Sequence, residues 1–343
     1  MKMHGLTAAA LAAAALAVAP AAQAADFYAG KTITVVCPYP PGGTYDRMAR
    51  LVAQYLPRHI PGGPTAIVQN KPGGGGVIGI RGVYRADPDG LTLLHFSSTT
   101  VAQQVTGSIK DIDFAKFNWL GSPGGAHYLF FMRSERPERT IEQLKKTTRP
   151  IRVASSGPGS LLTQAAKFLQ RAGKFNMRLV SGYKGYNPMA LAVKQNEVDG
   201  VSTAGAAVLV NSVTRQMRAD GTIKLILSMG GAPPPPPLAA ELASLPKFVD
   251  AIDDPKDRAA YVAFSGLLAA SRPFVATPGL PADRVAILRK AMVAMMADPV
   301  FVKTATGQGF VLNTLDGAAT AKLALSVLKL PADTKERLKA LLK

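Results

Sequence analysis

One stretch of the chain, KTITVVCPYPPGGTYDRMAR at residues 31–50, constrains the fold more than any other. Its β-branched run at Thr32–Val36 predicts a buried strand, which the following prolines bring to an end. Gly42-Gly43 then turn the chain into a helix predicted over Asp46–Leu56. Glycines at such a turn allow backbone N–H groups to face an anion at the helix N-terminus. The pattern alone also fits an ordinary strand-to-helix turn, with Asp46 capping the helix or accepting a bond from a ligand.

A second turn of the same kind occurs further along the chain. The strand predicted at Ile151–Ala154 leads into SSGPGS at residues 155–160, and an amphipathic helix is predicted over Leu161–Arg171, closed by Gly173. The chain therefore offers two helix N-termini that can receive an anion.

Small hydroxyl residues follow the strand predicted at Leu91–Phe96, beginning with Ser97 and Ser98. Ligands of open α/β sheets bind at the carboxyl ends of strands, so both serines are candidate ligand residues. They can equally cap the helix that follows.

Strands alternate with helices along the remaining chain. Further strands are predicted at Thr65–Gln69, Trp119–Met132, Arg178–Val180, Val198–Ser202 and Lys224–Met229. Further helices are predicted at Thr140–Lys146 with a capping box, from Asn187-Pro188 to Asn196, at Pro281–Ala297, after Asp298-Pro299 and from Pro331, while Pro233–Pro237 predicts a polyproline tether. This alternation predicts an α/β fold with mainly parallel sheets.

Two glycine turns, each at the head of its own sheet, predict two lobes with a ligand cleft between them. We expect residues 25–125 and 230–343 to form lobe I and residues 126–229 to form lobe II. The two crossing segments are expected to act as a hinge.

Residues 1–24 predict a cleaved signal peptide. Lys2 precedes an apolar stretch at Leu6–Ala19, and Ala22-Gln23-Ala24 forms a small-residue cleavage site. Beyond it no uninterrupted apolar run is long enough to span a bilayer. We therefore expect a soluble periplasmic protein whose mature chain begins near Ala25.

The charge of the chain favours an anionic ligand. Its 40 Lys and Arg residues exceed its 22 Asp and Glu residues, giving a formal net charge of +18. The basic residues are spread along the chain without interleaved aromatic residues, so no nucleic-acid partner is predicted. A small anion fits this distribution better.

We predict no cofactor, no metal site and no catalytic residues. Gly74-x-Gly76-x-x-Gly79 formally matches the dinucleotide fingerprint, but it follows the first strand–turn–helix unit and lacks the acidic residue expected downstream. Close packing of a helix start explains these glycines. The single cysteine, Cys37, is expected to be a buried inert thiol, and the four histidines lack metal-ligand spacing.

Five segments, taken in order, resemble one family. They are PYPPGGTYDRMARLVAQYL, AIVQNKPGGGGVIG, ADPDGLTLL, SSGPGS and GYKGYNPMALAVKQNEVDG. Together they are similar to the solute-binding receptors of tripartite tricarboxylate transporters, also called Bug-type or TctC-like proteins. The resemblance implies a type II periplasmic-binding-protein fold, a small carboxylate ligand held between the lobes, and delivery to the membrane permease subunits of the transporter.

The resemblance also implies the residues that contact the ligand. The family motifs map onto Pro41, Gly42, Gly43, Thr44, Asp46, Ser155, Ser156, Gly157, Ser160, Tyr183, Lys184 and Gly185. Ser97 and Ser98, at the strand end described above, and Tyr45, Ser202 and Thr203, where this sequence departs from the family pattern, complete the seventeen candidates. Tyr45 stands where many relatives have a small residue, and Pro158 stiffens the second loop. Ser202-Thr203 replaces an acidic residue that helps amino-acid-binding relatives to recognise an ammonium group, so an amino-acid ligand is not expected.

Three functional classes remain open on the sequence. A transport receptor, expected to be a monomer, is the first. A periplasmic sensor that signals to a membrane protein uses the same kind of receptor, and neighbouring genes would separate the two. An exported enzyme is the weakest alternative because no catalytic constellation is present.

Overall fold

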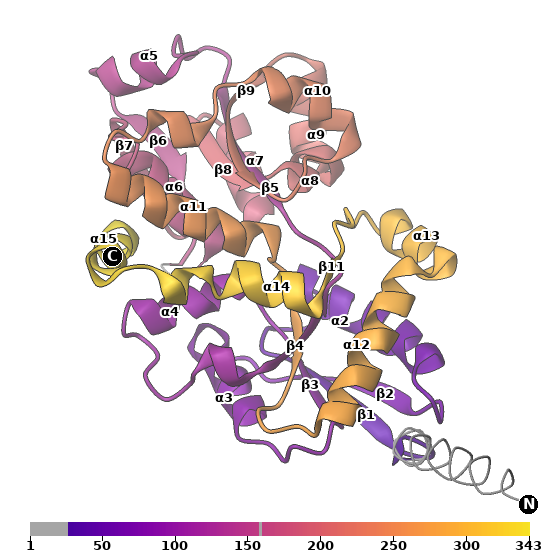
Figure 1. The fold of residues 1–343 in the computed structure, drawn as a ribbon. Helices are drawn as coiled ribbons and strands as arrows, with labels where there is room; N and C mark the ends of the chain where they lie inside the picture. Colours follow the sequence, from indigo (N-terminus) through magenta and orange to yellow (C-terminus); the bar gives the residue numbers. More distant parts are fainter. Residues whose placement is uncertain (1–26, 158–159) are drawn as a thin grey trace, which may run out of the picture. The chain divides into compact units, whose positions relative to one another are not determined.

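The computed structural model describes residues 27–157 and 160–343 (Figure 1). The predicted signal peptide and Pro158 lie outside the described residues. The chain forms two compact units. The first comprises residues up to Phe96 with Lys116–Gly121 and Phe274–Val302, and the second comprises Ser97–Ala115, Ser122–Pro273 and Lys303–Lys343. The lobe boundaries given by the sequence remain a prediction.

The first unit is built on a mixed sheet with strand order β2-β1-β3-β10-β4. The strands are β1 (Thr32–Cys37), β2 (Thr65–Asn70), β3 (Thr92–His95), β4 (Asn118–Ser122) and β10 (Phe274–Ala276). β1 is parallel to β2 and β3, whereas β10 runs antiparallel to β3 and β4. The helices are α2 (Thr44–Tyr55), α3 (Val77–Tyr84) and α12 (Ala282–Ala297), with α13 (Pro299–Gly307) beginning in this unit.

The second unit contains a five-stranded sheet with strand order β7-β6-β8-β5-β9. Its strands are β5 (His127–Arg133), β6 (Ile151–Ala154), β7 (Met177–Val180), β8 (Gly200–Ala204) and β9 (Ile223–Gly231). β6 is parallel to β7 and β8, and β5 is antiparallel to β8 and β9. Buried apolar side chains such as Leu129, Phe131 and Val201 form its core.

Helices and one short strand, β11 (Leu315–Asp316), complete the second unit. The helices are α4 (Val101–Val105), α5 (Ile141–Lys146), α6 (Leu161–Arg171), α7 (Tyr186–Lys194), α8 (Gly205–Val210), α9 (Ser212–Ala219), α10 (Pro236–Ser244), α11 (Pro255–Ala269), α14 (Gly317–Ala324) and α15 (Ala332–Leu342). Within the described residues, no helix combines the length and apolar character that a membrane span requires.

Many predicted elements are confirmed by the structure. α6 has the predicted bounds, and Thr140 and Gln143 make both bonds of the predicted capping box at α5. Cys37 is buried, and burial raises the pKa of its thiol to about 11. Gly173 follows the C-cap of α6, but its φ is not left-handed, whereas that of Lys174 is +55°. A Cβ on Gly173 would lie 2.7 Å from the Leu169 carbonyl oxygen, so space explains this glycine.

Several expectations about the elements are wrong. Four of the strands named for each sheet run in one direction, as expected of mainly parallel sheets, but β10 and β5 run against their neighbours, which was not predicted. The strand predicted at Trp119–Met132 is two strands, β4 and β5, in different sheets. The break falls at residues 123–125, where proline offers no N–H and a Cβ on Gly125 would overlap the Ala269 carbonyl oxygen.

The other corrections concern helix starts. α7 begins at Tyr186 with Gly185 as its N-cap, so Asn187 lies in the first turn and does not cap it. The expected polyproline tether stops at Pro235, because Pro236 and Pro237 begin α10, where a fixed φ suits the first turn. The helix α11 was not predicted.

The C-terminal helix α15 is tied to the second unit by charged groups. Arg337 makes two bonds of 2.7 Å to Asp257 on α11, whose side chain is buried. On α6, the Lys167 ammonium donates to the carbonyl oxygens of Leu342 and Lys343 at 2.7 and 2.9 Å. A cation here satisfies carbonyl groups that a helix C-terminus leaves without partners.

Two glycines end β9, beside the start of β5. Gly231 has φ of +108°, and a Cβ there would overlap the Ala126 carbonyl oxygen. That oxygen accepts a bond from the Ala232 N–H at 3.1 Å. Gly230 also has positive φ, +75°, but a Cβ there would meet nothing within 4 Å. Comparing substitutions at Gly230 and Gly231 therefore separates the effect of backbone strain from that of steric overlap.

We expect Gly231→Ala to lower the free energy of unfolding by about 2–5 kcal/mol, because strain and overlap add. Gly230→Ala, which suffers the strain alone, should lose about 1–2 kcal/mol. Urea denaturation of both variants measures the difference. Equal losses would mean that the close approach of Gly231 to Ala126 is not what requires a glycine.

Candidate functional site

The loop between β1 and α2 leaves an uncapped helix N-terminus on the surface. α2 begins at Thr44, two residues earlier than predicted, and its N-cap is Gly43, which provides no side-chain bond. Pro41, Gly42, Gly43 and Thr44 are all exposed. Only Gly42 needs a glycine conformation, with φ of +84°, since Gly43 has φ of −72°. The exposed N–H end of a twelve-residue helix favours an anion.

Asp46 organises this loop from inside. Its buried carboxylate accepts bonds from the Gly42 N–H at 2.8 Å, from Arg50 Nε at 3.0 Å and from Asn70 Nδ2 at 2.8 Å. Asn70 also donates to the Tyr39 carbonyl oxygen at 3.0 Å. Burial by itself raises the pKa of Asp46, but the bonds from Arg50, Gly42 and Asn70 outweigh it and hold that pKa below its ordinary value.

The network changes the role expected for Asp46. It is not the N-cap of α2 but lies in the first turn. Its oxygens already accept from three partners within the first unit. We therefore interpret Asp46 as the residue that shapes the loop, rather than as one that accepts a bond from the ligand.

Tyr45 belongs to a series of aromatic rings in the first unit. Its ring lies 4.8 Å from that of Tyr39 and 5.3 Å from that of His95, and the His95 ring stacks on Phe274 at 4.2 Å. Tyr39 and Tyr45 are half-buried, whereas His95 and Phe274 are fully buried. Tyr39 and His95 lie at the carboxyl ends of β1 and β3, where ligands of such sheets bind.

The glycine run after β2 makes room for this loop. A Cβ on Gly76 would lie 3.2 Å from the Tyr39 ring, and one on Gly79 would lie 2.9 Å from the Pro38 side chain. Gly76 and Gly79 of Gly74-x-Gly76-x-x-Gly79 thus allow close packing of the α3 start against residues 38–39.

In the second unit, the predicted serines lie at the carboxyl ends of two parallel strands. Ala154 of β6 pairs with Val180 of β7, so the segments that follow these strands adjoin. The buried Ser155 hydroxyl lies 2.8 Å from that of Ser181, and the Ser155 N–H donates to the Val180 carbonyl at 2.8 Å. Ser155 therefore links the two loops.

Ser156 and Ser160 form a hydroxyl cluster with Thr163 at the start of α6. Ser160 is the N-cap of α6, and its hydroxyl accepts from the Thr163 N–H at 3.2 Å. The Ser156 and Ser160 hydroxyls are bonded to each other, and the Ser156 N–H donates to Thr163 Oγ1 at 3.0 Å. Gly157 is exposed and its φ is not left-handed, so strain does not require a glycine there.

The segment after β7 presents a second uncapped helix start. Gly182 and Gly185 have φ of +114° and +97° and flank Tyr183-Lys184. Gly185 is the N-cap of α7 and provides no side-chain bond. Lys184 is exposed, while the Tyr183 hydroxyl donates to Glu197 at 3.2 Å. Burial, together with Glu197, raises the pKa of Tyr183.

Four predicted residues are less available to a ligand. The Ser98 hydroxyl is fully buried and donates to the Leu267 carbonyl at 2.6 Å. Ser202 and Thr203 are buried within β8, and the Ser202 hydroxyl lies 3.3 Å from the Met229 sulfur. Ser97 is half-buried, with its hydroxyl 2.8 Å from that of Thr99. Ser97 and Ser98 thus follow β3, whereas Ser202 and Thr203 lie inside β8.

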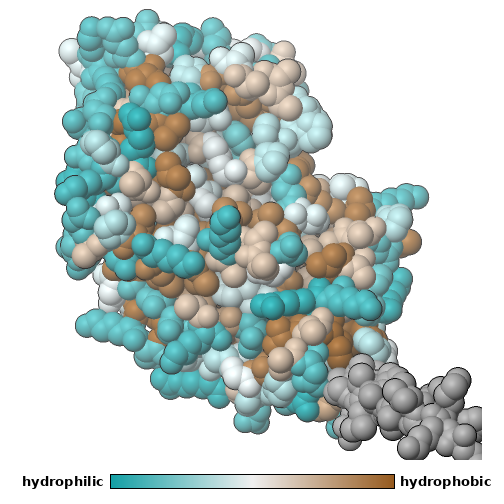
Figure 2. All heavy atoms as spheres, in the orientation of Figure 1, coloured by the Kyte–Doolittle hydropathy of each residue, from teal (hydrophilic) through white to brown (hydrophobic). Residues whose placement is uncertain are grey.

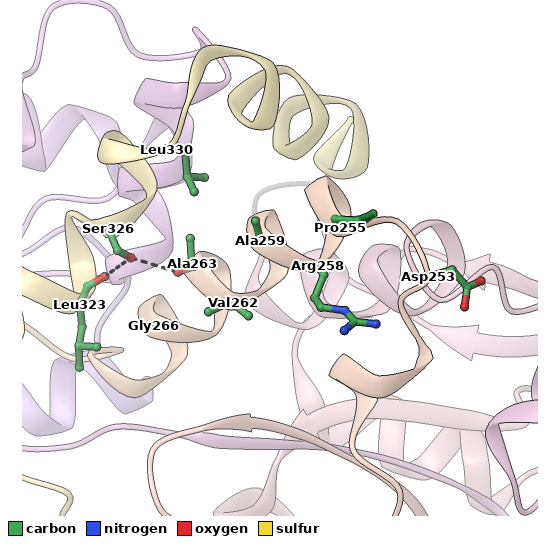
Figure 3. A pocket seen from close by; sticks show the side chains of 10 residues that line it. All are labelled: Asp253, Pro255, Arg258, Ala259, Val262, Ala263, Gly266, Leu323, Ser326 and Leu330. Carbon is green, nitrogen blue, oxygen red and sulfur yellow. Dashed lines mark hydrogen bonds between the residues drawn. The ribbon is translucent and has the colours of Figure 1, made fainter.

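Two hollows of the second unit lie elsewhere. The larger, about 640 Å³, runs along α11, and Figure 3 shows Val262 and Leu330 among its lining side chains. Its Ser326 hydroxyl donates to the Leu323 carbonyl at 2.7 Å, so that polar group is satisfied. The smaller, about 280 Å³, is lined by His127, Ser228 and Lys247 among others. Neither hollow is lined by a predicted ligand residue.

Sequence reasoning did not identify Asn70, Arg50, Tyr39 and Thr163 as parts of these loops. Asn70 ends β2 and pairs with Cys37, the last residue of β1, in a parallel register. A polar residue at the end of the strand predicted next to the first one was therefore a usable sequence signal for a contact with the glycine turn. Arg50 lies one helical turn after Asp46, a spacing that favours an ion pair. In the part of the chain that the structure describes, no group of three His, Cys, Asp or Glu side chains could hold a metal ion.

Comparison with known proteins yields consistent matches. The family model described as "Tripartite tricarboxylate transporter family receptor" (TctC) matches residues 48–224, just over half of the chain. A UPF0065 protein from the tcbD-tcbE intergenic region of Pseudomonas sp. strain P51 is 28% identical over 238 residues, which cover 66% of this chain and 68% of that protein.

Solved structures share the fold. A TctC solute binding protein from Polaromonas, without ligand, has a TM-score of 0.69 and 21% identity, covering 92% of this chain and 98% of its own. The MatC protein of Rhodopseudomonas palustris, with bound malate, has a TM-score of 0.58 and 19% identity, and the match covers 91% of this chain and 99% of that protein. The predicted periplasmic-binding-protein fold is confirmed.

We expect Asp46→Asn to lower the free energy of unfolding by about 1–3 kcal/mol at pH 7, because an amide cannot accept all three bonds. The pKa of Asp46 is depressed in the fold, so its contribution is present above the ordinary carboxyl pKa of about 3.9 and is lost as the pH falls through the lower folded value. Urea denaturation across pH should therefore show the free energies of unfolding of the wild type and of Asp46→Asn converging below about pH 4.

The control is the same substitution at an exposed carboxylate, Asp250→Asn. A loss at pH 7 no larger than that of the control would contradict the assignment.

Proposed function

Because the chain belongs to the tripartite tricarboxylate transporter receptor family, we propose that it captures a small carboxylate outside the cytoplasm and delivers it to a membrane permease. The predictions of the family and of a binding protein rather than an enzyme are confirmed by this membership. The single observation that carries the proposal is the exposed, uncapped N-terminus of α2, held in place by the buried Asp46 network.

We assign the ligand carboxylate to the N-terminal turn of α2. Backbone donors at Gly43 and Thr44 and the Thr44 hydroxyl lie on an exposed surface, where the positive end of the helix dipole favours an anion. Asp46 fixes the turn that carries these donors through its bond to the Gly42 N–H. Its negative charge is compensated by Arg50. An anion at the turn therefore does not face an uncompensated carboxylate.

The second unit carries further donors that we propose as ligand contacts. They are the hydroxyls of Ser155, Ser156 and Ser160, backbone groups of Gly157 and Gly185, and the side chains of Tyr183 and Lys184. Lys184 is an exposed cation beside the uncapped start of α7. The malate bound to MatC, a protein of the same fold, supports a carboxylate as the ligand class.

The transport role and the location rest on the family and on the sequence. Cleavage of the signal peptide predicted at residues 1–24 would place the mature chain in the periplasm. On the face drawn in Figure 2, hydrophilic and apolar residues are intermixed over the surface. We retain the lobe boundaries at 125/126 and 229/230 as part of the proposal.

We expect the tightest-binding acid in a panel of small carboxylates to stabilise the protein, and its neutral amide to fail. The amide has one acceptor and adds two donors, which would face donors of the site and leave groups unpaired at about 1–3 kcal/mol each. At a hundred times its Kd, the acid should stabilise the native state by about 2.7 kcal/mol. Thermal unfolding of the mature protein with each compound at equal concentration tests this.

The acid and the amide differ in charge but hardly in size, so shape alone cannot separate them. Equal shifts for both would mean that the helix ends do not select an anion. No shift with any carboxylate in the panel would count against the proposed function itself.

A further inference from the structure

A series of aromatic rings runs from the core of the first unit to the proposed carboxylate turn. His95 and Phe274 are directly opposite each other on β3 and β10, and their rings are stacked within 9° of parallel. The Tyr45 ring lies 5.3 Å from His95, and the Tyr39 ring lies 4.8 Å from Tyr45. These centroid distances lie in the range of favourable aromatic pairs. The series ends in two half-buried tyrosines beside the exposed residues 41–44.

Both tyrosines are held in place before any ligand binds. The Tyr39 ring packs against Gly76, whose positive φ of +101° and missing Cβ allow the approach, and Asn70 holds the Tyr39 carbonyl. Tyr45 is the second residue of α2, and its ring rests against buried His95. A surface that is already ordered loses little conformational freedom when a flat ligand stacks on it.

The charge at the proposed site is suited to one carboxylate. Within the first unit, Asp46 is the only charged side chain among the predicted ligand residues, and Arg50 compensates its charge. The N-terminus of a helix contributes about half a unit of positive charge. A ligand with three carboxylates would leave most of its charge without a protein partner, which is costly away from water.

We infer that the ligand of this receptor is an aromatic monocarboxylate, bound with its carboxylate at the N-terminus of α2 and its ring against Tyr45 and Tyr39. The inference rests on the proposed function and assigns a chemical class to its ligand. It makes Tyr45 the determinant of specificity.

The test compares benzoate with cyclohexanecarboxylate, malate and citrate by isothermal titration calorimetry on the mature protein. Benzoate and cyclohexanecarboxylate share the carboxylate and the six-membered ring, and differ in aromaticity. We expect benzoate to bind about three- to tenfold more tightly than cyclohexanecarboxylate, and citrate to bind most weakly.

Three variants assign the preference to a residue. Tyr45→Leu should reduce the ratio of the benzoate and cyclohexanecarboxylate affinities to about one. Tyr45→Phe keeps the ring and should restore the preference. Tyr84→Leu makes the same change at a tyrosine that packs on Phe117 instead, and should leave the ratio unchanged. Circular dichroism checks that each variant is folded.

The outcomes separate the inference from the proposed function. If malate or citrate binds more tightly than benzoate, or if Tyr45→Leu keeps the preference for benzoate, the aromatic assignment is overturned while the carboxylate receptor stands. If no acid binds, both are overturned.

Discussion

The carboxylate of Asp46 is the interaction on which the candidate site depends. Three elements meet at its two oxygens: the turn at Gly42, the helix α2 through Arg50, and the end of β2 through Asn70. Burying a carboxylate costs free energy unless its hydrogen bonds are made. Movement of any of the three partners away from Asp46 would therefore destabilise the fold. The network also explains how a loop of prolines and glycines, which has few side chains to pack, has a defined conformation.

The parts of the fold that could be predicted are those coded by local pattern. Thr32–Val36, Ile151–Ala154 and the helix Leu161–Arg171 were recognised because β-branched runs and helical periodicity act over a few neighbouring residues. The antiparallel strands were not, because strand direction depends on partners distant in the chain, as Phe274 and His95 illustrate. The split between β4 and β5 has the same origin, since it follows from the approach of Gly125 to Ala269.

For the candidate site, sequence located the loops better than the roles within them. The glycine turn was found, but not that Gly42 alone of its two glycines has a left-handed backbone, nor that Asp46 bonds to the turn instead of capping the helix. Such assignments depend on which residue begins the helix. Because α2 begins at Thr44 and not at Asp46, Gly43 is the N-cap and Asp46 lies in the first turn. Asn70 and Thr163 were not assigned, because the Asn70 amide bonds to Asp46, 24 residues away in the chain, and the Thr163 hydroxyl accepts from the Ser156 N–H across a turn.

The two units are interleaved along the chain, and this has a consequence for how the protein is made. β10, which lies between β3 and β4, is contributed by Phe274–Ala276, and α15, whose last carbonyls are held by Lys167, ends at Leu342. A nascent chain that stops short of these segments has an open sheet in the first unit and lacks a helix of the second. Neither unit can complete its core from the early part of the chain, so the folding of each unit depends on residues far downstream of its first strands.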